Sequence, residues 1–111
     1  MSESKIYKFV VRVNHESKTY LKYNEELICF DVTEILFIEN LNEQIKLYTE
    51  NRNFTVEISI DLIILRLPKS FLRIHENYIV NKAKLSIRDD EFLYINNNKI
   101  PYKVNLQCLN Y

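Results

Sequence analysis

Residues 71–81, with the sequence FLRIHENYIVN, gather most of the side chains in this chain that suit a chemical task. Arg73 and His75 lie there between apolar residues, and Glu76 and Asn77 follow directly. Arg73 suits either a phosphate contact or support of a loop, and the segment carries no catalytic signature. A structural role is the alternative: Arg73 and His75 would form a hydrogen-bonded pair that holds the loop, and Asn77 would cap turn backbone.

Two other blocks precede this segment: ILFIEN at residues 35–40 and LYTENRNFTVE at residues 47–57. In this order and spacing, the three blocks resemble the LytTR family, the DNA-binding domains of many bacterial response regulators. The resemblance is strongest over residues 18–102, and residues 1–111 are expected to form a single LytTR-like domain. It implies a mainly β fold, with short antiparallel sheets in an elongated arrangement and one or two short helices.

The resemblance also implies binding to double-stranded DNA by inter-strand loops that enter the major groove. The first such loop spans residues 40–44, and Gln44 and Lys46 are candidates to reach a base edge or a phosphate. Relatives often have a polar or imidazole side chain where this chain has Ile45. We expect Ile45 to lie in the core.

The second and third contact regions depart from the family pattern. After His75 relatives have Arg, Lys or Asn, whereas this chain has Glu76, whose carboxylate repels phosphate but accepts from a cytosine amine. Lys103 and Asn105 follow the last strand, where relatives carry an arginine; the lysine supplies charge and the asparagine suits adenine. The predicted DNA-binding residues are Gln44, Lys46, Arg73, Glu76, Asn77, Lys103 and Asn105.

The whole chain has 15 basic and 15 acidic side chains, so its formal net charge is zero. A DNA-binding protein usually concentrates basic side chains on one face. Two functions therefore compete. The first is a transcriptional regulator that binds repeated half-sites in duplex DNA, as two copies or as a homodimer paired along an uncovered strand edge at residues 7–14. The second is a LytTR-like module that pairs with another LytTR regulator and silences it without binding DNA.

Composition argues against several other classes of function. The chain has no glycine, so phosphate-cradling loops and nucleophile elbows are not expected. Two histidines and two distant cysteines give no zinc spacing, and we predict no cofactor, small-molecule substrate or enzymatic activity. Asp89 and Asp90 are interpreted as a turn rather than as a general acid and base. No segment has the pattern of a signal peptide or a membrane span, so we expect a cytoplasmic protein with Cys29 as a reduced core residue.

Hydrophobic periodicity predicts the elements that position these residues. Residues 51–53 are predicted to form a hairpin turn in which asparagine takes the left-handed conformation, as substitutes for glycine do. Ser59 is predicted to cap a helix that Pro68 ends, and residues 104–111 to form a frayed second helix. Asn81 is expected to cap an irregular turn. The predicted strands cover residues 7–13, 19–23, 26–30, 35–40, 45–50, 54–58, 85–88, 92–95 and 99–102, and the predicted first helix covers residues 59–67.

Overall fold

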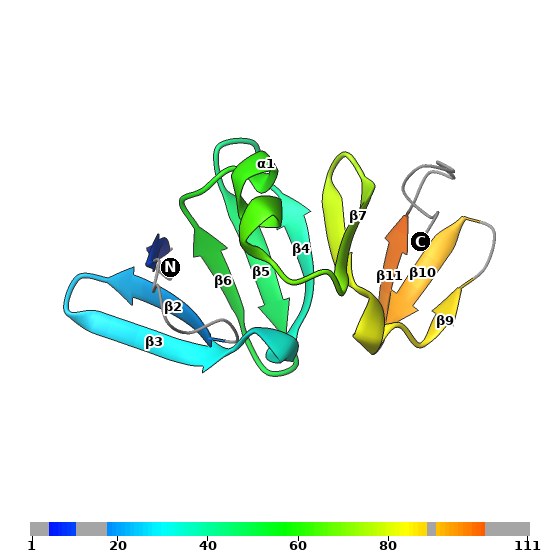
Figure 1. The fold of residues 1–111 in the computed structure, drawn as a ribbon, viewed down its shortest axis with the longest axis horizontal. Helices are drawn as coiled ribbons and strands as arrows, with labels where there is room; N and C mark the ends of the chain where they lie inside the picture. The colour runs from blue at the N-terminus through cyan, green and yellow to red at the C-terminus, as the bar shows by residue number, and fades with distance from the viewer. Residues whose placement is uncertain (1–4, 11–17, 89–90, 102–111) are drawn as a thin grey trace, which may run out of the picture.

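The structure is a computed structural model of the chain and describes residues 5–10, 18–88 and 91–101. These residues form eleven strands, one short α-helix and three single-turn 3-10 helices (Figure 1). The strands are β1 (Ile6–Val10), β2 (Lys18–Tyr23), β3 (Glu26–Asp31), β4 (Ile35–Asn40), β5 (Ile45–Thr49), β6 (Asn53–Val56), β7 (Phe71–His75), β8 (Tyr78–Asn81), β9 (Ile87–Arg88), β10 (Phe92–Ile95) and β11 (Asn98–Pro101). The helices are η1 (Val32–Glu34), α1 (Ile60–Ile63), η2 (Ile64–Arg66) and η3 (Lys82–Lys84).

Eight strands form one sheet in the order β3-β2-β1-β6-β5-β4-β8-β7, and three form a second sheet in the order β11-β10-β9. Among the described residues, every pair of neighbouring strands is antiparallel except β1 with β6. Figure 1 shows the strands spread along the long axis of the molecule, from β3 at one end to β9 at the other. The predicted mainly β, elongated arrangement is confirmed.

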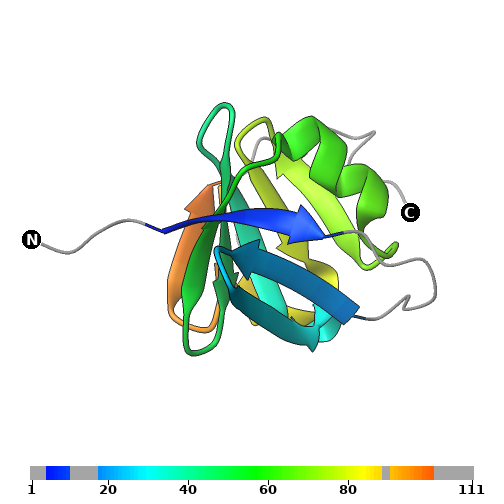
Figure 2. The same cartoon turned by 90° about the vertical axis from the view of Figure 1, so that its left-hand side faces the viewer.

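Strand β1 lies inside the large sheet and not at its edge. On one side it pairs with β2, where Phe9 lies opposite Leu21, and on the other with β6, where Tyr7 lies opposite Val56. Figure 2 shows β1 and β2 side by side on the face turned to the viewer. The predicted free edge at residues 7–14 is therefore wrong in its described part, because both sides of the strand are paired. The edge strands of this sheet are β3 and β7.

Strand β4 is buried on both faces, which explains its continuous apolar sequence ILFI. Ile35 and Ile38 pack into one core, whereas Leu36 and Phe37 pack into another. The register with β5 shifts between Ile35 and Phe37, and such a bulge turns two consecutive side chains to the same face. Strand β4 therefore separates the two cores and contributes to both.

The two cores lie on opposite faces of the large sheet. Figure 2 shows α1 on one side of the central strands and β11 on the other. The first core lies between the sheet and α1, and includes residues from β1 to β8. The second core lies between the sheet and β9–β11, and contains Leu36, Phe37, Ile74, Val80, Leu93, Ile95 and Ile100.

Helix α1 begins where the sequence predicts. Ser59 Oγ accepts a hydrogen bond from Leu62 N at 3.3 Å, which satisfies a donor of the first turn. The α-helical turn continues as the 3-10 turn η2, and the backbone becomes extended at Leu67, directly before Pro68. The predicted helix is confirmed, and it consists of one α-helical turn followed by one 3-10 turn.

Asparagine supplies the backbone conformation that glycine usually provides. Positive φ angles occur at Asn24 (53°), Asn42 (76°) and Asn96 (55°). The hairpin of β5 and β6 is confirmed, but residues 51–53 do not adopt a left-handed conformation. Its turn is held instead by Thr49, whose N–H donates to Arg52 O at 2.8 Å and whose hydroxyl oxygen accepts from Arg52 N at 3.2 Å.

Cys29 is exposed, so the prediction that it lies in the core is wrong. Side chains alternate along β3, and Ile28 and Phe30 occupy the buried face, which leaves Leu27 and Cys29 on the outer one. Because all four residues of the sequence LICF are apolar, the sequence pattern did not show this alternation.

Other predicted features lie outside the described residues: the turn at Asp89 and Asp90, the candidates Lys103 and Asn105, and the helix at residues 104–111. In the part of the chain that the structure describes, there is no helix with the length and apolar character to cross a membrane.

Candidate nucleic-acid interface

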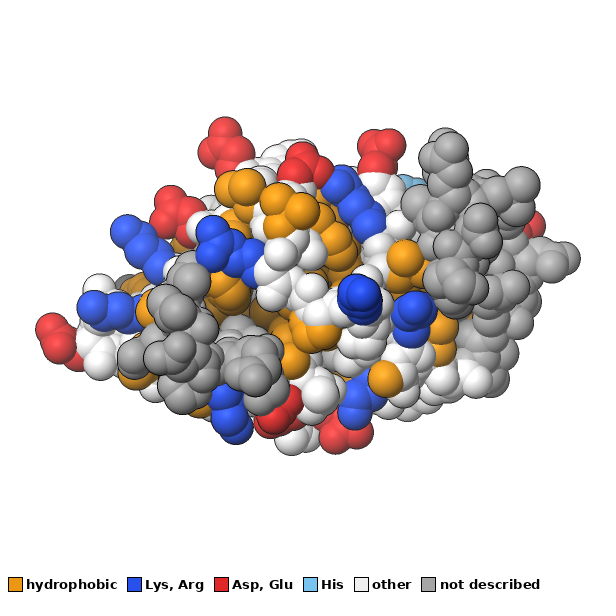
Figure 3. Space-filling model, viewed as in Figure 1, with side chains coloured by type: hydrophobic (Ala, Val, Ile, Leu, Met, Phe, Trp, Pro, Cys, Tyr) orange, Lys and Arg blue, Asp and Glu red, His pale blue; other side chains and the backbone are white. Residues whose placement is uncertain are grey.

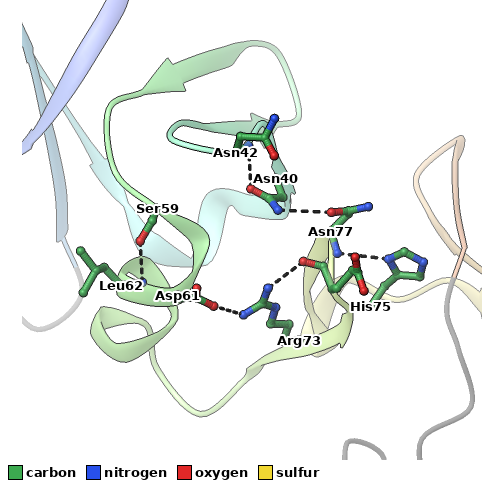
Figure 4. Close-up of polar contacts among 9 residues, drawn as sticks. Asn40, Asn42, Ser59, Asp61, Leu62, Arg73, His75 and Asn77 are labelled. Carbon is green, nitrogen blue, oxygen red and sulfur yellow. Dashed lines mark hydrogen bonds and ion pairs between the residues drawn. The ribbon is translucent and has the colours of Figure 1, made fainter.

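Two inter-strand loops lie side by side at one end of the large sheet (Figure 4). One joins β4 to β5 at residues 41–44, and the other joins β7 to β8 at residues 76–77; we refer to them as the loop pair. Asn40 N donates to Asn77 O at 2.8 Å, and Asn40 Nδ2 donates to Asn77 Oδ1 at 3.2 Å. Because β4 and β8 are neighbours in the sheet, these bonds fix the two loops relative to each other.

Asn40 also shapes its own loop. Its Oδ1 accepts a hydrogen bond from Asn42 N at 2.9 Å, and Asn42 has a φ of 76°. Leu41 N donates to Gln44 O at 2.9 Å, which closes the turn. An asparagine suits position 42 because its short polar side chain tolerates the left-handed region.

Arg73 fastens the second loop to α1. Its Nη1 forms an ion pair with the Asp61 carboxylate, and its Nη2 donates to Glu76 O at 2.7 Å (Figure 4). His75 Nδ1 accepts from Asn77 N at 3.1 Å. Arg73 and His75 therefore both hold the loop, through separate bonds rather than as the predicted mutual pair.

The two asparagines of this region differ in role. The side chain of Asn77 bonds to Asn40 and not to the backbone of its own turn, contrary to the prediction of a cap. Asn81 is a cap as predicted: its Oδ1 accepts from Ala83 N at 3.1 Å, and its Nδ2 donates to Ile35 O at 2.9 Å. Asn81 is 2% exposed, so this buried amide ties η3 to β4.

The described residues at the loop end carry exposed negative charge. Glu43 and Glu76 are exposed on the loop pair, and the Asp61 side chain is 77% exposed on α1. The Arg73 side chain is 31% exposed, and its guanidinium is already paired with Asp61. Figure 3 shows acidic side chains along the upper edge, where the loops and α1 lie. Phosphate is repelled by these carboxylates.

Lys46 extends away from the loop pair. Its Nζ lies 5.5 Å from the centre of the Tyr48 ring, farther along β5. Its neighbours across the sheet are Glu39 on β4 and Thr55 on β6. Ile45 faces the opposite side and is 0% exposed, so its predicted place in the core is confirmed.

Glu39 organises a cluster of rings on the same face as Lys46. Tyr48 Oη donates to Glu39 Oε1 at 2.8 Å, and the Tyr48 ring stacks on Phe37 with centroids 4.3 Å apart. Burial raises the pKa of Tyr48, and its hydrogen bond to Glu39 raises it further. The pKa of Tyr78, which lies opposite Glu39, is raised by burial and by the same carboxylate. The glutamate that follows the apolar run of β4 therefore has a structural role.

Three predicted contact residues, Arg73, Glu76 and Asn77, lie together; Gln44 is in the adjoining loop, Lys46 lies apart, and Lys103 and Asn105 lie outside the described residues. Sequence reasoning missed Asn40 and Asp61 as organisers of the loops. Asn40 is 37 positions from Asn77, and Asp61 is 12 positions from Arg73, so no local pattern predicted these contacts. The only sequence signal for their roles was their position at the ends of predicted elements. Within the described residues, no group of three or more potential metal ligands is present.

The fold and the loop pair define a β domain that presents inter-strand loops at one end of a sheet. The family model of the LytTr DNA-binding domain matches residues 25–106. The match spans most of the chain, and the chain therefore belongs to the LytTR family of DNA-binding domains. Strands β1 and β2 precede the matched residues.

Among solved structures, the chain is similar to the LytTr DNA-binding domain of a protein described as a methyl-accepting/DNA response regulator from Bacillus cereus. The TM-score is 0.68 and the identity 24%, and the alignment covers 78% of this chain and 85% of the other. At this identity the likeness shows a shared fold. No curated protein sequence matches the chain significantly.

Proposed function

We propose that the chain binds duplex DNA sequence-specifically through the loop pair and regulates transcription in the bacterial cytoplasm. Membership in a family of DNA-binding domains supports DNA as the partner. The observation that carries the loop assignment is the pair of hydrogen bonds between Asn40 and Asn77. Loops fixed in this way lose little conformational freedom on binding, which favours precise contact with base edges in the major groove.

Each predicted residue has a definite role in this proposal. Gln44 and Asn77 carry amides, which suit adenine, and Glu76 accepts from a cytosine amine. Arg73 acts as a support, because its guanidinium is occupied by Asp61 and by loop backbone. Two copies occupy repeated half-sites, and the residues Lys46, Lys103 and Asn105 supply the remaining phosphate and base contacts.

A titration of labelled duplex tests the proposal. The protein is added to a duplex with LytTR-type repeats and to a scrambled duplex, and fluorescence anisotropy is measured at several salt concentrations. Tighter, salt-dependent binding to the repeats is the expected result, since phosphate contacts release counterions. Equal binding to both duplexes at every salt concentration would contradict sequence-specific recognition.

The two predicted lysine contacts are tested by Lys46→Ala and Lys103→Ala. Each is expected to weaken binding and to reduce the slope of log affinity against log salt by about 1. Lys99→Ala is the matched control, because Lys99 is an exposed cation on the separate strand β11. An affinity and slope equal to those of the wild type would remove the substituted lysine from the site.

The charge of the loop end favours a second candidate function, in which the chain pairs with another LytTR regulator and silences it without DNA. Glu43, Glu76 and Asp61 all lie at this end, and the formal net charge of the chain is zero. This function predicts no binding to any duplex at low salt, together with tight association with a full-length LytTR regulator in sedimentation experiments. A clear gel shift of duplex DNA would eliminate it.

A further inference from the structure

A groove opens where the starts of β1, β3 and β6 meet the side of β5. Its volume is about 640 Å³, which lies in the range of roughly 300–1,000 Å³ typical of small-molecule sites. The buried rings of Tyr7 and Phe54 form its apolar base. Its polar lining residues are Lys5, Glu26, Lys46, Arg52, Asn53 and Thr55.

Among the residues that the structure describes, two of the three cations in this groove form no ion pair. Lys5 Nζ lies 3.3 Å from Glu26 Oε1, so these two charges offset each other. The Arg52 guanidinium lies over the Phe54 ring at 4.9 Å, and Lys46 lies over Tyr48. Within the described ranges neither Lys46 nor Arg52 forms an ion pair, so the groove has a surplus of positive charge.

Neutral hydrogen-bonding groups stand beside these cations. Thr55 lies directly opposite Lys46 in the sheet, so the hydroxyl and the ammonium are on the same face. Asn53 lies opposite Tyr48 and offers an amide next to Arg52. Arginine, lysine, threonine and asparagine are the side chains that proteins use for phosphate oxygens.

We propose that this groove is a phosphate-binding site. Arg52, over Phe54 on one face of the β5–β6 hairpin, offers a planar fork of N–H donors to two phosphate oxygens. Lys46, over Tyr48 on the other face, offers a compact charge. Two sources present this chemistry: the backbone of duplex DNA and a free phosphorylated small molecule. The phosphate-binding site itself does not depend on the proposed function. Only the assignment of its ligand to the DNA backbone rests on that function.

Lys46 connects the groove to the first loop, which makes the DNA backbone one candidate source. Lys46 is two residues beyond Gln44, so it lies about 7 Å along the strand from the end of the first loop. Arg52 lies at the other end of the β5–β6 hairpin, so a duplex held by the loop pair would have to run along this hairpin to meet both cations. This arrangement supplies positive charge that the described loop residues lack.

The first arm of the test measures duplex affinity for Arg52→Gln, which keeps most of the side-chain stem over Phe54 and removes the charge. We expect affinity to fall about threefold to tenfold and the salt slope to fall by about 1. Arg66→Gln is the matched control, because Arg66 is exposed on η2, and it should change neither quantity. Lys46→Gln serves as a second groove variant if Arg52→Gln fails to fold, as judged by its unfolding transition.

The second arm uses pyrophosphate without DNA and follows the Asn53 side-chain amide by NMR. A saturable shift in the wild type that is lost in Arg52→Gln supports the site for a free phosphate, even if no variant binds duplex and the proposed function fails. Loss of duplex affinity in Arg52→Gln, with Arg66→Gln unchanged, supports the DNA backbone as the source. Wild-type duplex affinity in Arg52→Gln together with no saturable pyrophosphate shift would overturn the proposal.

Discussion

The loop pair and the groove are built in opposite ways. In the loop pair the polar groups have partners inside the protein: Asn40 bonds to Asn77, and Arg73 is held by a carboxylate and by backbone. In the groove, Lys46 and Arg52 lie over aromatic rings, and in the described part of the chain neither forms an ion pair. One region is fixed in position and exposes negative charge, whereas the other exposes positive charge.

This difference teaches that position and attraction are separate properties of a DNA-binding surface. Contacts to phosphates provide most of the attraction and carry no sequence information, whereas contacts to base edges need accurate placement. A region with fixed loops can therefore serve recognition even when its own charge is unfavourable. Substitutions in one region should therefore leave the contribution of the other region to binding unchanged.

Arg73→Ala is expected to have the largest effect, because it releases the loop pair from α1. Loss of the Asp61 ion pair and of the bond to Glu76 O should lower the free energy of unfolding by about 2 kcal/mol. Arg73→Lys should retain only part of this stability, because an ammonium lacks the planar fork that reaches both partners. Urea denaturation measures both variants, with Arg66→Ala as control. Full recovery in Arg73→Lys would show that one contact is enough.

Asn40→Ala should have the next largest effect. The variant keeps the backbone bond to Asn77 but loses the side-chain bonds to Asn77 and to Asn42 N, at a cost of about 1 kcal/mol. Hydrogen exchange at Asn42 should become faster, while exchange in β10 stays unchanged. Asn97→Ala, at an exposed turn position, is the control. Unchanged exchange at Asn42 would mean that the side chain does not order the loop.

Glu76→Gln should tighten duplex binding by about twofold to fivefold, because it removes an exposed negative charge from the loop pair. The gain should shrink as salt is raised, since exposed charges are screened. Glu25→Gln, on the exposed turn between β2 and β3, should leave affinity unchanged. The glutamine oxygen can still accept from the cytosine amine, so weaker binding of Glu76→Gln would show that the negative charge strengthens this base contact by more than it repels phosphate.

Tyr48→Phe should have the smallest effect at neutral pH, about 0.5 kcal/mol, because it removes one hydrogen bond to Glu39. The folded protein raises the pKa of Tyr48 above its ordinary value of 10. Its protonated form therefore contributes stability that is complete below pH 10 and is lost as the pH rises above 10. Urea unfolding at neutral pH and at about pH 11 should show a smaller alkaline loss in Tyr48→Phe than in the wild type. An identical loss would exclude this contribution.

Local patterns in the sequence were sufficient for much of the fold. The apolar run at residues 35–40 predicted a strand, the spacing of isoleucines predicted α1, and Ser59 and Pro68 marked the ends of the helix. These features depend on neighbours within a few positions, where periodicity and capping rules apply.

Features that depend on pairing between distant segments were not predictable in this way. Whether Cys29 is buried or exposed depends on which face of β3 meets the core, and it is exposed. Whether β1 is an edge strand depends on its parallel pairing with β6. The bonds of Asn40 to Asn77 and of Arg73 to Asp61 join different loops and helices, and no local pattern determines such partners. Family resemblance located the loops, but not the groove beside them.

The position of β4 between two cores has a consequence for folding. Each face of this strand completes a different core, and Ile35 O accepts from Asn81, 46 positions away. Contacts this distant in sequence close late and slowly, so we expect a single cooperative transition in which neither half is stable alone. A chain cut after the helix would keep β4 but expose Leu36 and Phe37 to water, and such an open apolar face would promote aggregation.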